Sequence, residues 1–169
     1  VILYDQRGRG ASAAPPGARA ARVEHDAGDL VALREALGLD RWDVLGHSWG
    51  GGIAMLAAAQ DPDAVRNLVV VDPVGPTGAW LPGLHDAALA LLRGRDREAY
   101  EELAAHDPAA LAVPDPAVHS AYARAVYPAW LADPTLPRLF APPRSSSATG
   151  AAVAARLRRD GSDWRDLLR

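Results

Sequence analysis

The five residues Gly46-His47-Ser48-Trp49-Gly50 have the types and spacing needed for nucleophilic catalysis. A serine hydroxyl attacks a carbonyl carbon only when a base takes its proton. The Gly-x-Ser-x-Gly pattern is typical of a sharp, strained turn that presents the serine between a strand and a helix. We expect Gly46 and Gly50 where the two backbones approach too closely for a side chain. Ser48 is therefore the candidate nucleophile.

The residue after the serine would supply a second part of the site. The backbone N–H of Trp49 is expected to donate a hydrogen bond to the oxyanion that forms during acyl transfer. The N-terminus of the following helix would add a partial positive charge there. A glycine-rich turn carrying a bystander serine would show the same five residues, so the flanking elements have to decide between the two interpretations.

Those flanking elements alternate between strand and helix. Apolar runs predict strands at residues 1–4, 42–45 and 67–71, and helical spacing predicts helices at about 23–37 and 50–60. This order predicts an α/β fold with about three parallel strands and flanking helices. A strand before the serine and a small-residue helix after it favour the catalytic interpretation.

The composition changes after residue 73. Proline and glycine become frequent, strand-like runs end, and helical stretches recur at about 84–92, 95–105, 116–126 and 148–158. The sequence therefore predicts two domains. Residues 1–73 form a partial α/β core with the nucleophile turn, and residues 74–169 form an all-helical, cap-like region.

Four stretches of the core resemble α/β-hydrolases, and within them the proline iminopeptidase-like branch. They are Asp5-Gln6-Arg7-Gly8-Arg9-Gly10-Ala11-Ser12, Leu33-Arg34-Glu35-Ala36-Leu37-Gly38-Leu39, Gly46-His47-Ser48-Trp49-Gly50-Gly51 and Leu68-Val69-Val70-Val71-Asp72-Pro73. The resemblance implies a serine hydrolase that acts on an amide or ester through an acyl-enzyme. It favours a proline iminopeptidase-like aminopeptidase. The alternatives are a general carboxylesterase or lactonase, and a non-catalytic hydrolase fragment or binding scaffold.

The same resemblance places the catalytic acid and histidine after later strands, beyond Arg169, and an oxyanion loop before Val1. We therefore expect these 169 residues to be the central portion of a longer enzyme, with little activity alone. The strand at residues 1–4 would then lack a neighbour, and apolar sheet edges would be exposed.

Several acidic residues are secondary candidates. Asp72 follows the third predicted strand, where some lipases of this fold carry the acid, although Asp72-Pro73 also reads as a simple strand end. Glu98, Glu101 and Glu102 share a predicted cap helix. Aminopeptidases of the resembling branch use cap carboxylates to hold a free amino group, and a solvated helix face is the competing interpretation.

The remaining candidates are expected to be structural. Asp5 and Arg7 are expected to hold their loop together by hydrogen bonds. A catalytic base must reach hydrogen-bonding distance of Ser48. The histidines, for which surface or packing roles are expected, are His25, His47, His85, His106 and His119.

Composition limits the other functions. The net charge is −3, which predicts no attraction to nucleic acid or anionic membranes. The chain has no cysteine, which excludes disulfides and thiolate metal sites. No apolar run reaches the roughly 18 residues of a membrane span. We expect a small-molecule or short-peptide substrate, no metal, no cofactor and a cytoplasmic location; the oligomeric state and acyl specificity are left open.

Overall fold

A computed structural model of the chain describes residues 1–13, 22–106, 116–133, 136 and 163–169. Contacts within the chain divide it into two compact units. The first comprises Val1–Trp80 together with Arg156–Arg169, and the second comprises Leu81–Ala155. The Gly-x-Ser-x-Gly turn lies in the first unit. The domain boundary expected at residue 73 stays a prediction.

The helices and strands follow the order that the sequence predicts after residue 22. They are α1 (Val23–Ala36), β1 (Trp42–His47), α2 (Trp49–Gln60), β2 (Val65–Val71), α3 (Trp80–Leu91), α4 (Gly94–His106), α5 (Pro116–Trp130) and the 3-10 helix η4 (Arg165–Leu168). The helix predicted at 148–158 lies outside the described residues.

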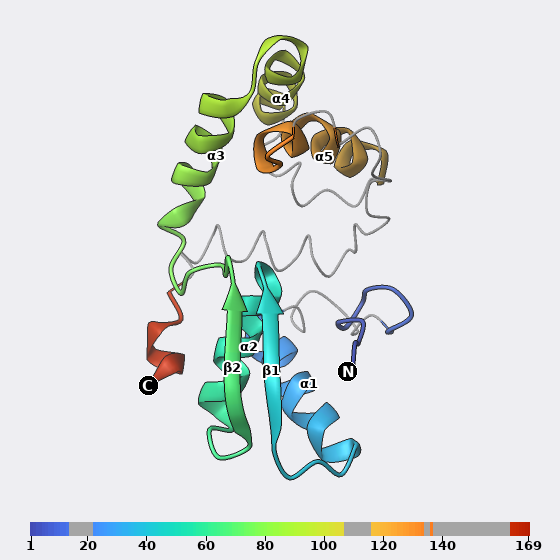
Figure 1. Cartoon of the computed structure of the whole chain (residues 1–169), viewed down its shortest axis with the longest axis vertical. Coiled ribbons are helices and arrows are strands. Elements are labelled where there is room, and N and C mark those ends of the chain that lie inside the picture. Colours follow the sequence, from blue (N-terminus) through green and yellow to red (C-terminus); the bar gives the residue numbers. More distant parts are fainter. Residues whose placement is uncertain (14–21, 107–115, 134–135, 137–162) are drawn as a thin grey trace. The chain divides into compact units, whose positions relative to one another are not determined.

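Strands β1 and β2 form a parallel pair that helix α2 connects (Figure 1). Leu45 pairs with Val69, and His47 at the end of β1 pairs with Val71 at the end of β2. The carboxyl ends of both strands therefore lie side by side. In open α/β sheets this edge is where ligands bind. The predicted α/β class is confirmed, and Ser48 follows one of these strand ends.

The prediction of a strand at residues 1–4 is wrong. This segment has no strand assignment, and the sheet contains β1 and β2 alone among the described residues. Val1, Ile2 and Leu3 are exposed. A β-branched run forms a strand only when a neighbour pairs with its N–H and C=O groups. In this structure no described strand pairs with the segment.

The core of the first unit lies between the sheet and two helices. Helix α2 contacts both strands, and α1 packs against α2. Figure 1 shows α2 behind the strand pair. Ile53 and Leu56 of α2 are fully buried. The buried core residues are Val23, Ala27, Leu30, Val44, Ile53, Ala54, Leu56, Ala57 and Trp164.

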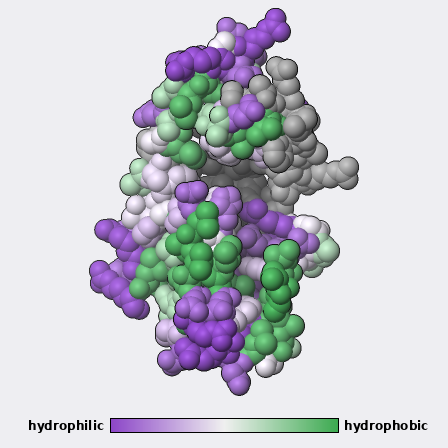
Figure 2. Space-filling view, viewed as in Figure 1, coloured by the Kyte–Doolittle hydropathy of each residue, from purple (hydrophilic) through white to green (hydrophobic). Residues whose placement is uncertain are grey.

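The other face of the sheet is apolar and exposed. Successive strand side chains alternate between faces, and Val44 is buried on the α2 side, so Leu45 points to the opposite face. Leu45 is 69% exposed, and its partner Val69 is 48% exposed. Hydrophobic residues form a continuous patch over the strands in Figure 2.

The second unit contains α4, α5 and most of α3. Ala88, Leu92, Tyr100, Ala125 and Val126 form its buried cluster. No helix among the described residues is long and apolar enough to cross a membrane.

Candidate active site

Ser48 occupies a strained turn between β1 and α2. Its φ is 53° and its ψ is −119°, a conformation that costs an L-residue with a side chain about 1–3 kcal/mol. Such strain persists only where the surrounding structure enforces it. The residue is exposed at the carboxyl end of the sheet.

Backbone hydrogen bonds on both sides of Ser48 enforce this conformation. The Ser48 N–H donates to the Val71 carbonyl at 3.0 Å. The Ser48 carbonyl accepts from the N–H groups of Gly51 at 3.0 Å and of Val74 at 3.1 Å. The hydroxyl makes no capping hydrogen bond to the helix. The backbone is therefore fixed while the side-chain oxygen remains exposed for chemistry.

The two glycines of the turn differ in their surroundings. A Cβ on Gly46 would lie 2.6 Å from the Gly50 carbonyl carbon and 2.7 Å from the Gly51 nitrogen, too close for any side chain. A Cβ on Gly50 would meet no atom of the described residues within 4 Å. The predicted close approach is thus found at Gly46, and the steric reason given for Gly50 is wrong.

Two further glycines make close approaches that sequence reasoning missed. A Cβ on Gly51 would lie 2.7 Å from Pro73 Cβ. A Cβ on Gly52 would lie 2.6 Å from Trp164 Cη2 and 2.7 Å from Val74 Cγ2. The run of consecutive glycines after the serine was the available signal, because a helix interior normally disfavours glycine by about 1 kcal/mol.

Trp49 is the first residue of α2. N–H groups in the first turn of a helix have no acceptor within the helix, so they are available to an external oxygen atom. The indole ring of Trp49 stacks on Trp164, with 6.3 Å between ring centroids and 23° between planes. Its Nε1 is buried and has no hydrogen-bond acceptor among the described residues.

Asp72 follows β2 at the same edge of the sheet as Ser48. It lies between Val71 and Val74 in sequence, and both of these residues make backbone hydrogen bonds to Ser48. Asp72 is exposed and has a φ of 43°, a second strained non-glycine residue at this edge. A role of its carboxylate as the catalytic acid stays a prediction.

No histidine hydrogen bond to Ser48 is found in the described part of the chain. His47 is exposed at the end of β1, and His85 Nδ1 lies 2.9 Å from the hydroxyl of Tyr100. The side chains of His106 and His119 lie outside the described residues. In the same described ranges, no group of three or more metal-binding side chains could hold an ion.

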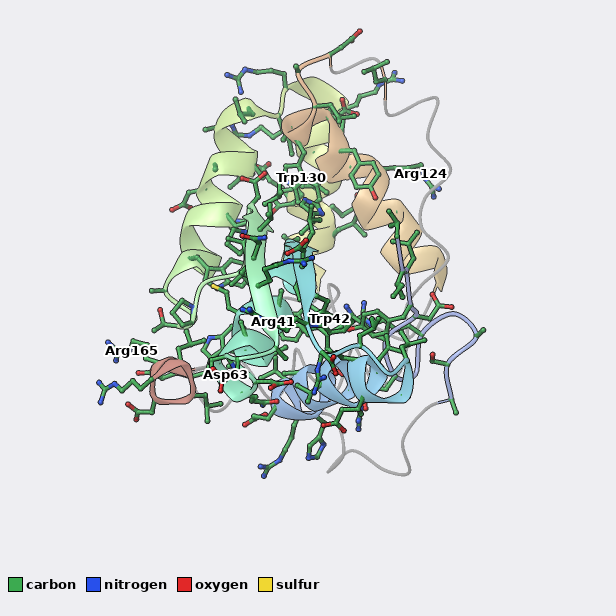
Figure 3. All side chains as sticks on the ribbon, turned by 60° about the horizontal axis from the view of Figure 1, so that its bottom comes forward. Arg41, Trp42, Asp63, Arg124, Trp130 and Arg165 are labelled. Carbon is green, nitrogen blue, oxygen red and sulfur yellow. The ribbon has the colours of Figure 1, made fainter. Side chains whose placement is uncertain are left out.

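The three glutamates of α4 are exposed. Glu101 accepts a hydrogen bond from Arg97 Nε at 2.9 Å, one helical turn away. Glu102 helps to line a cavity of about 580 Å³ between α4 and α5. Arg124, labelled on α5 in Figure 3, lines the same cavity. The other lining residues are Asp96, Ala99, Leu103, Ala121 and Ala125.

The loop after residue 4 is held by Asp5, as predicted. Its carboxylate accepts the Ala11 N–H at 2.9 Å, and its carbonyl accepts the Ser12 hydroxyl at 2.7 Å. Among the described residues, Arg7 bonds to a helix and not within the loop: its guanidinium donates to both carboxylate oxygens of Asp29 in α1, with a Nε–Oδ2 distance of 2.6 Å. The arginine therefore ties the loop to a helix.

Asp26 of α1 is an unexpected member of this region. It is only 5% exposed, and Arg7 Nε lies 3.8 Å from its Oδ1. Burial raises the pKa of Asp26 to about 6, against the opposing effect of the Arg7 charge. Burial, with Asp26 and Asp29 nearby, raises the pKa of Tyr4 to about 12. Helical spacing predicts the buried face of α1 but does not reveal that a carboxylate lies on it.

The profile of the alpha/beta hydrolase fold family matches residues 1–140. The chain belongs to this family.

Curated relatives include proteins with different printed activities. The chain is 38% identical over 103 residues to a RutD protein of Caulobacter sp. (strain K31), named as a proposed carbamate hydrolase; the match covers 59% of this chain and 37% of the relative. It is 35% identical over 80 residues to a proline iminopeptidase of Heyndrickxia coagulans, covering 47% and 28%. The chain thus spans about a third of the length of these relatives.

A solved structure supports the fold. The N-acyl homoserine lactonase AidH, complexed with N-butanoyl homoserine, has a TM-score of 0.55 and 20% identity to this chain. The match covers 96% of this chain and 53% of the lactonase.

Proposed function

We propose that the protein is a serine hydrolase in which Ser48 is the nucleophile and the Trp49 N–H is one oxyanion donor. The observation that carries this proposal is the strained, exposed conformation of Ser48, which two neighbouring segments hold through its backbone. A serine whose backbone is strained and whose hydroxyl caps no helix is typical of a nucleophile turn, and Ser48 has both properties.

The reaction would proceed in two balanced steps. Ser48 Oγ bonds to the carbonyl carbon of an amide or ester while a base takes the hydroxyl proton. The bond to the leaving nitrogen or oxygen then breaks, that atom receives the proton, and the acyl group stays on Ser48. Water attacks the acyl carbon, the base takes one proton from it, and Ser48 regains a proton as the acid product leaves. The base is not assigned to a described residue.

We favour an aminopeptidase that releases an N-terminal proline or small residue. Named proline iminopeptidases among the relatives support this choice. Glu102, whose carboxylate lines a cavity of the second unit, is the proposed binding residue for the free ammonium group of such a substrate. Glu98 and Glu101 are secondary candidates for the same role. A carboxylesterase or lactonase is the second candidate, which the fold shared with a lactonase favours.

Fluorophosphonate labelling tests the nucleophile. The protein, expressed from its complete coding sequence, should form a covalent adduct at Ser48 that peptide mass spectrometry locates. Ser48→Ala should abolish the adduct. Ser12→Ala is the matched control, because the Ser12 hydroxyl is engaged with the Asp5 carbonyl and should not react. An unlabelled wild-type protein, or equal labelling of Ser48→Ala, would refute the proposal.

A substrate panel separates the two activities. Prolyl and alanyl 4-nitroanilides should give higher kcat/KM values than 4-nitrophenyl butyrate or an N-acyl homoserine lactone. Glu102→Gln should raise KM for the prolyl substrate about tenfold, the loss of one charge-assisted hydrogen bond. The same change should leave an N-acetylated substrate unaffected, and Arg95→Gln, at an exposed position on the same helix that does not line the cavity, is the control. Preference for the ester or the lactone would select the second candidate.

A further inference from the structure

Trp164 lies against the nucleophile turn although it is far from it in sequence. It follows the residues that the hydrolase family profile matches, and it is 6% exposed within the core of the first unit. The neighbouring Arg165 extends away from η4 in Figure 3 and is exposed. Of these two adjacent residues, only Trp164 is directed into the core.

Trp164 contacts both segments that hold Ser48. Its indole stacks on the ring of Trp49, the residue directly after the serine. On the other side, its Nε1 donates to the Gly75 carbonyl at 3.1 Å, and its backbone N–H donates to the Pro76 carbonyl at 2.9 Å. Gly75 follows Val74, whose N–H donates to the Ser48 carbonyl.

The helix has a matching space for this ring. Trp164 Cη2 would lie 2.6 Å from a Cβ on Gly52, so only glycine admits the indole against the first turn of α2. Since the neighbouring Val74 would also clash with that Cβ, the ring, the valine and the helix form one tightly fitted contact.

The orientation of Trp49 depends on this contact. Its own Nε1 has no acceptor among the described residues, so no indole hydrogen bond fixes the ring. Packing against the core cluster that contains Trp164 then orients the ring, and the stack with Trp164 is the aromatic part of that packing. Trp49 is the first residue of α2, so loss of this packing would loosen the turn that begins the helix.

We propose that Trp164 is a positioning residue that holds the Trp49 N–H and the Ser48 backbone in their reactive geometry; this inference rests on the proposed function of Ser48. Trp164 touches neither substrate nor the reacting atoms. It acts by bridging α2 and the segment after β2, the two segments between which the serine is held. Errors of about 1 Å in such geometry reduce rates by about a hundredfold.

The experiment compares variants in the rate of fluorophosphonate labelling at Ser48, using the protein from its complete coding sequence. Trp164→Ala should lower the maximal labelling rate about thirtyfold, while the half-saturating probe concentration changes less than about twofold. Trp164→Phe keeps a ring for the stack but loses the bond to Gly75 and the distal indole atoms that lie against Gly52, so its rate should stay within about threefold of wild type and above that of Trp164→Ala. Leu167→Ala, an exposed position on η4, is the matched control and should change nothing.

Two outcomes separate the inference from the proposed function. Wild-type labelling of Ser48 with an unchanged rate in folded Trp164→Ala would overturn the inference and leave the nucleophile intact. An unlabelled wild-type protein would overturn both. If Trp164→Ala does not give a cooperative urea transition, Trp164→Leu replaces it. Trp164→Leu must then label at least about tenfold more slowly than Trp164→Phe, and equal rates would overturn the inference.

Discussion

The turn at Ser48 and the loop at residues 5–12 are both short, glycine-containing connections in the first unit, but different forces hold them. Backbone hydrogen bonds and close packing at glycine hold the turn. Backbone hydrogen bonds such as that from the Arg9 N–H to the Gln6 carbonyl also lie within the loop, but ionic side chains add to them: the Asp5 carboxylate bonds within the loop, and Arg7 reaches across to α1. Hydrogen bonds and close contacts made by the backbone fix the position of a residue, whereas flexible charged side chains at a surface let the segment that they hold shift. The turn therefore has the rigidity that a reacting group needs.

Gly46→Ala should have the largest effect on stability. Its Cβ would collide with backbone atoms of Gly50 and Gly51, which cannot move without displacing Ser48. We expect urea denaturation to show a loss of about 3 kcal/mol in the free energy of unfolding. Gly50→Ala is the matched control, because its Cβ meets open space and should change stability by no more than about 1 kcal/mol. Equal losses would mean that the turn is not held by close approach.

Ser48→Gly should be more stable than Ser48→Ala. Both variants lack the hydroxyl, but glycine adopts a φ of 53° without the steric cost that alanine retains. We expect a difference of about 1 kcal/mol in favour of glycine. At Ala32, an exposed position within α1, substitution by glycine should instead destabilise by about 1 kcal/mol. A preference for alanine at both positions would show that Ser48 is not strained in solution.

Arg7→Gln should loosen the loop at residues 5–12 with a smaller loss of stability than Gly46→Ala causes. The Arg7–Asp29 pair is part-buried and two-pronged, so its loss should destabilise by about 1 kcal/mol and speed hydrogen exchange in residues 5–12. Arg66→Gln removes a similar pair with Asp43 that is fully solvated. It should leave the denaturation midpoint unchanged. A large shift with Arg66→Gln would contradict the distinction between part-buried and solvated pairs.

A further expected effect is a change in the pH dependence of stability at Asp26. Because folding raises the pKa of this carboxyl from 3.8 to about 6, the folded chain binds the proton more tightly than the unfolded chain. Stability should therefore fall as pH rises from about 4 through about 6. Asp26→Asn should remove this slope in urea titrations between pH 4 and 7, with His25→Gln, a substitution at the adjacent residue, as control. Parallel curves for wild type and Asp26→Asn would count against burial of the ionised carboxylate.

The sequence predicted most elements because their signals are local. Helical spacing and the glycines around Ser48 act within a few residues, and the elements from α1 to α5 follow them. The strand prediction for residues 1–4 was wrong because a strand also requires a neighbouring strand that pairs with its backbone. The buried Asp26 and the contact of Trp164 with Gly52 were missed because each depends on residues distant in sequence.

The hydrogen bonds to the Ser48 carbonyl and N–H constrain how this gene can change in length. They fix the number of residues between Ser48 and Gly51 and between Val71 and Val74, because adding or removing one residue in either span would shift donors away from acceptors. The connection from Gln60 to Ala64 carries no such link to the turn. Natural insertions and deletions in homologous genes should therefore be frequent in the connection from Gln60 to Ala64 and rare in the spans Ser48–Gly51 and Val71–Val74.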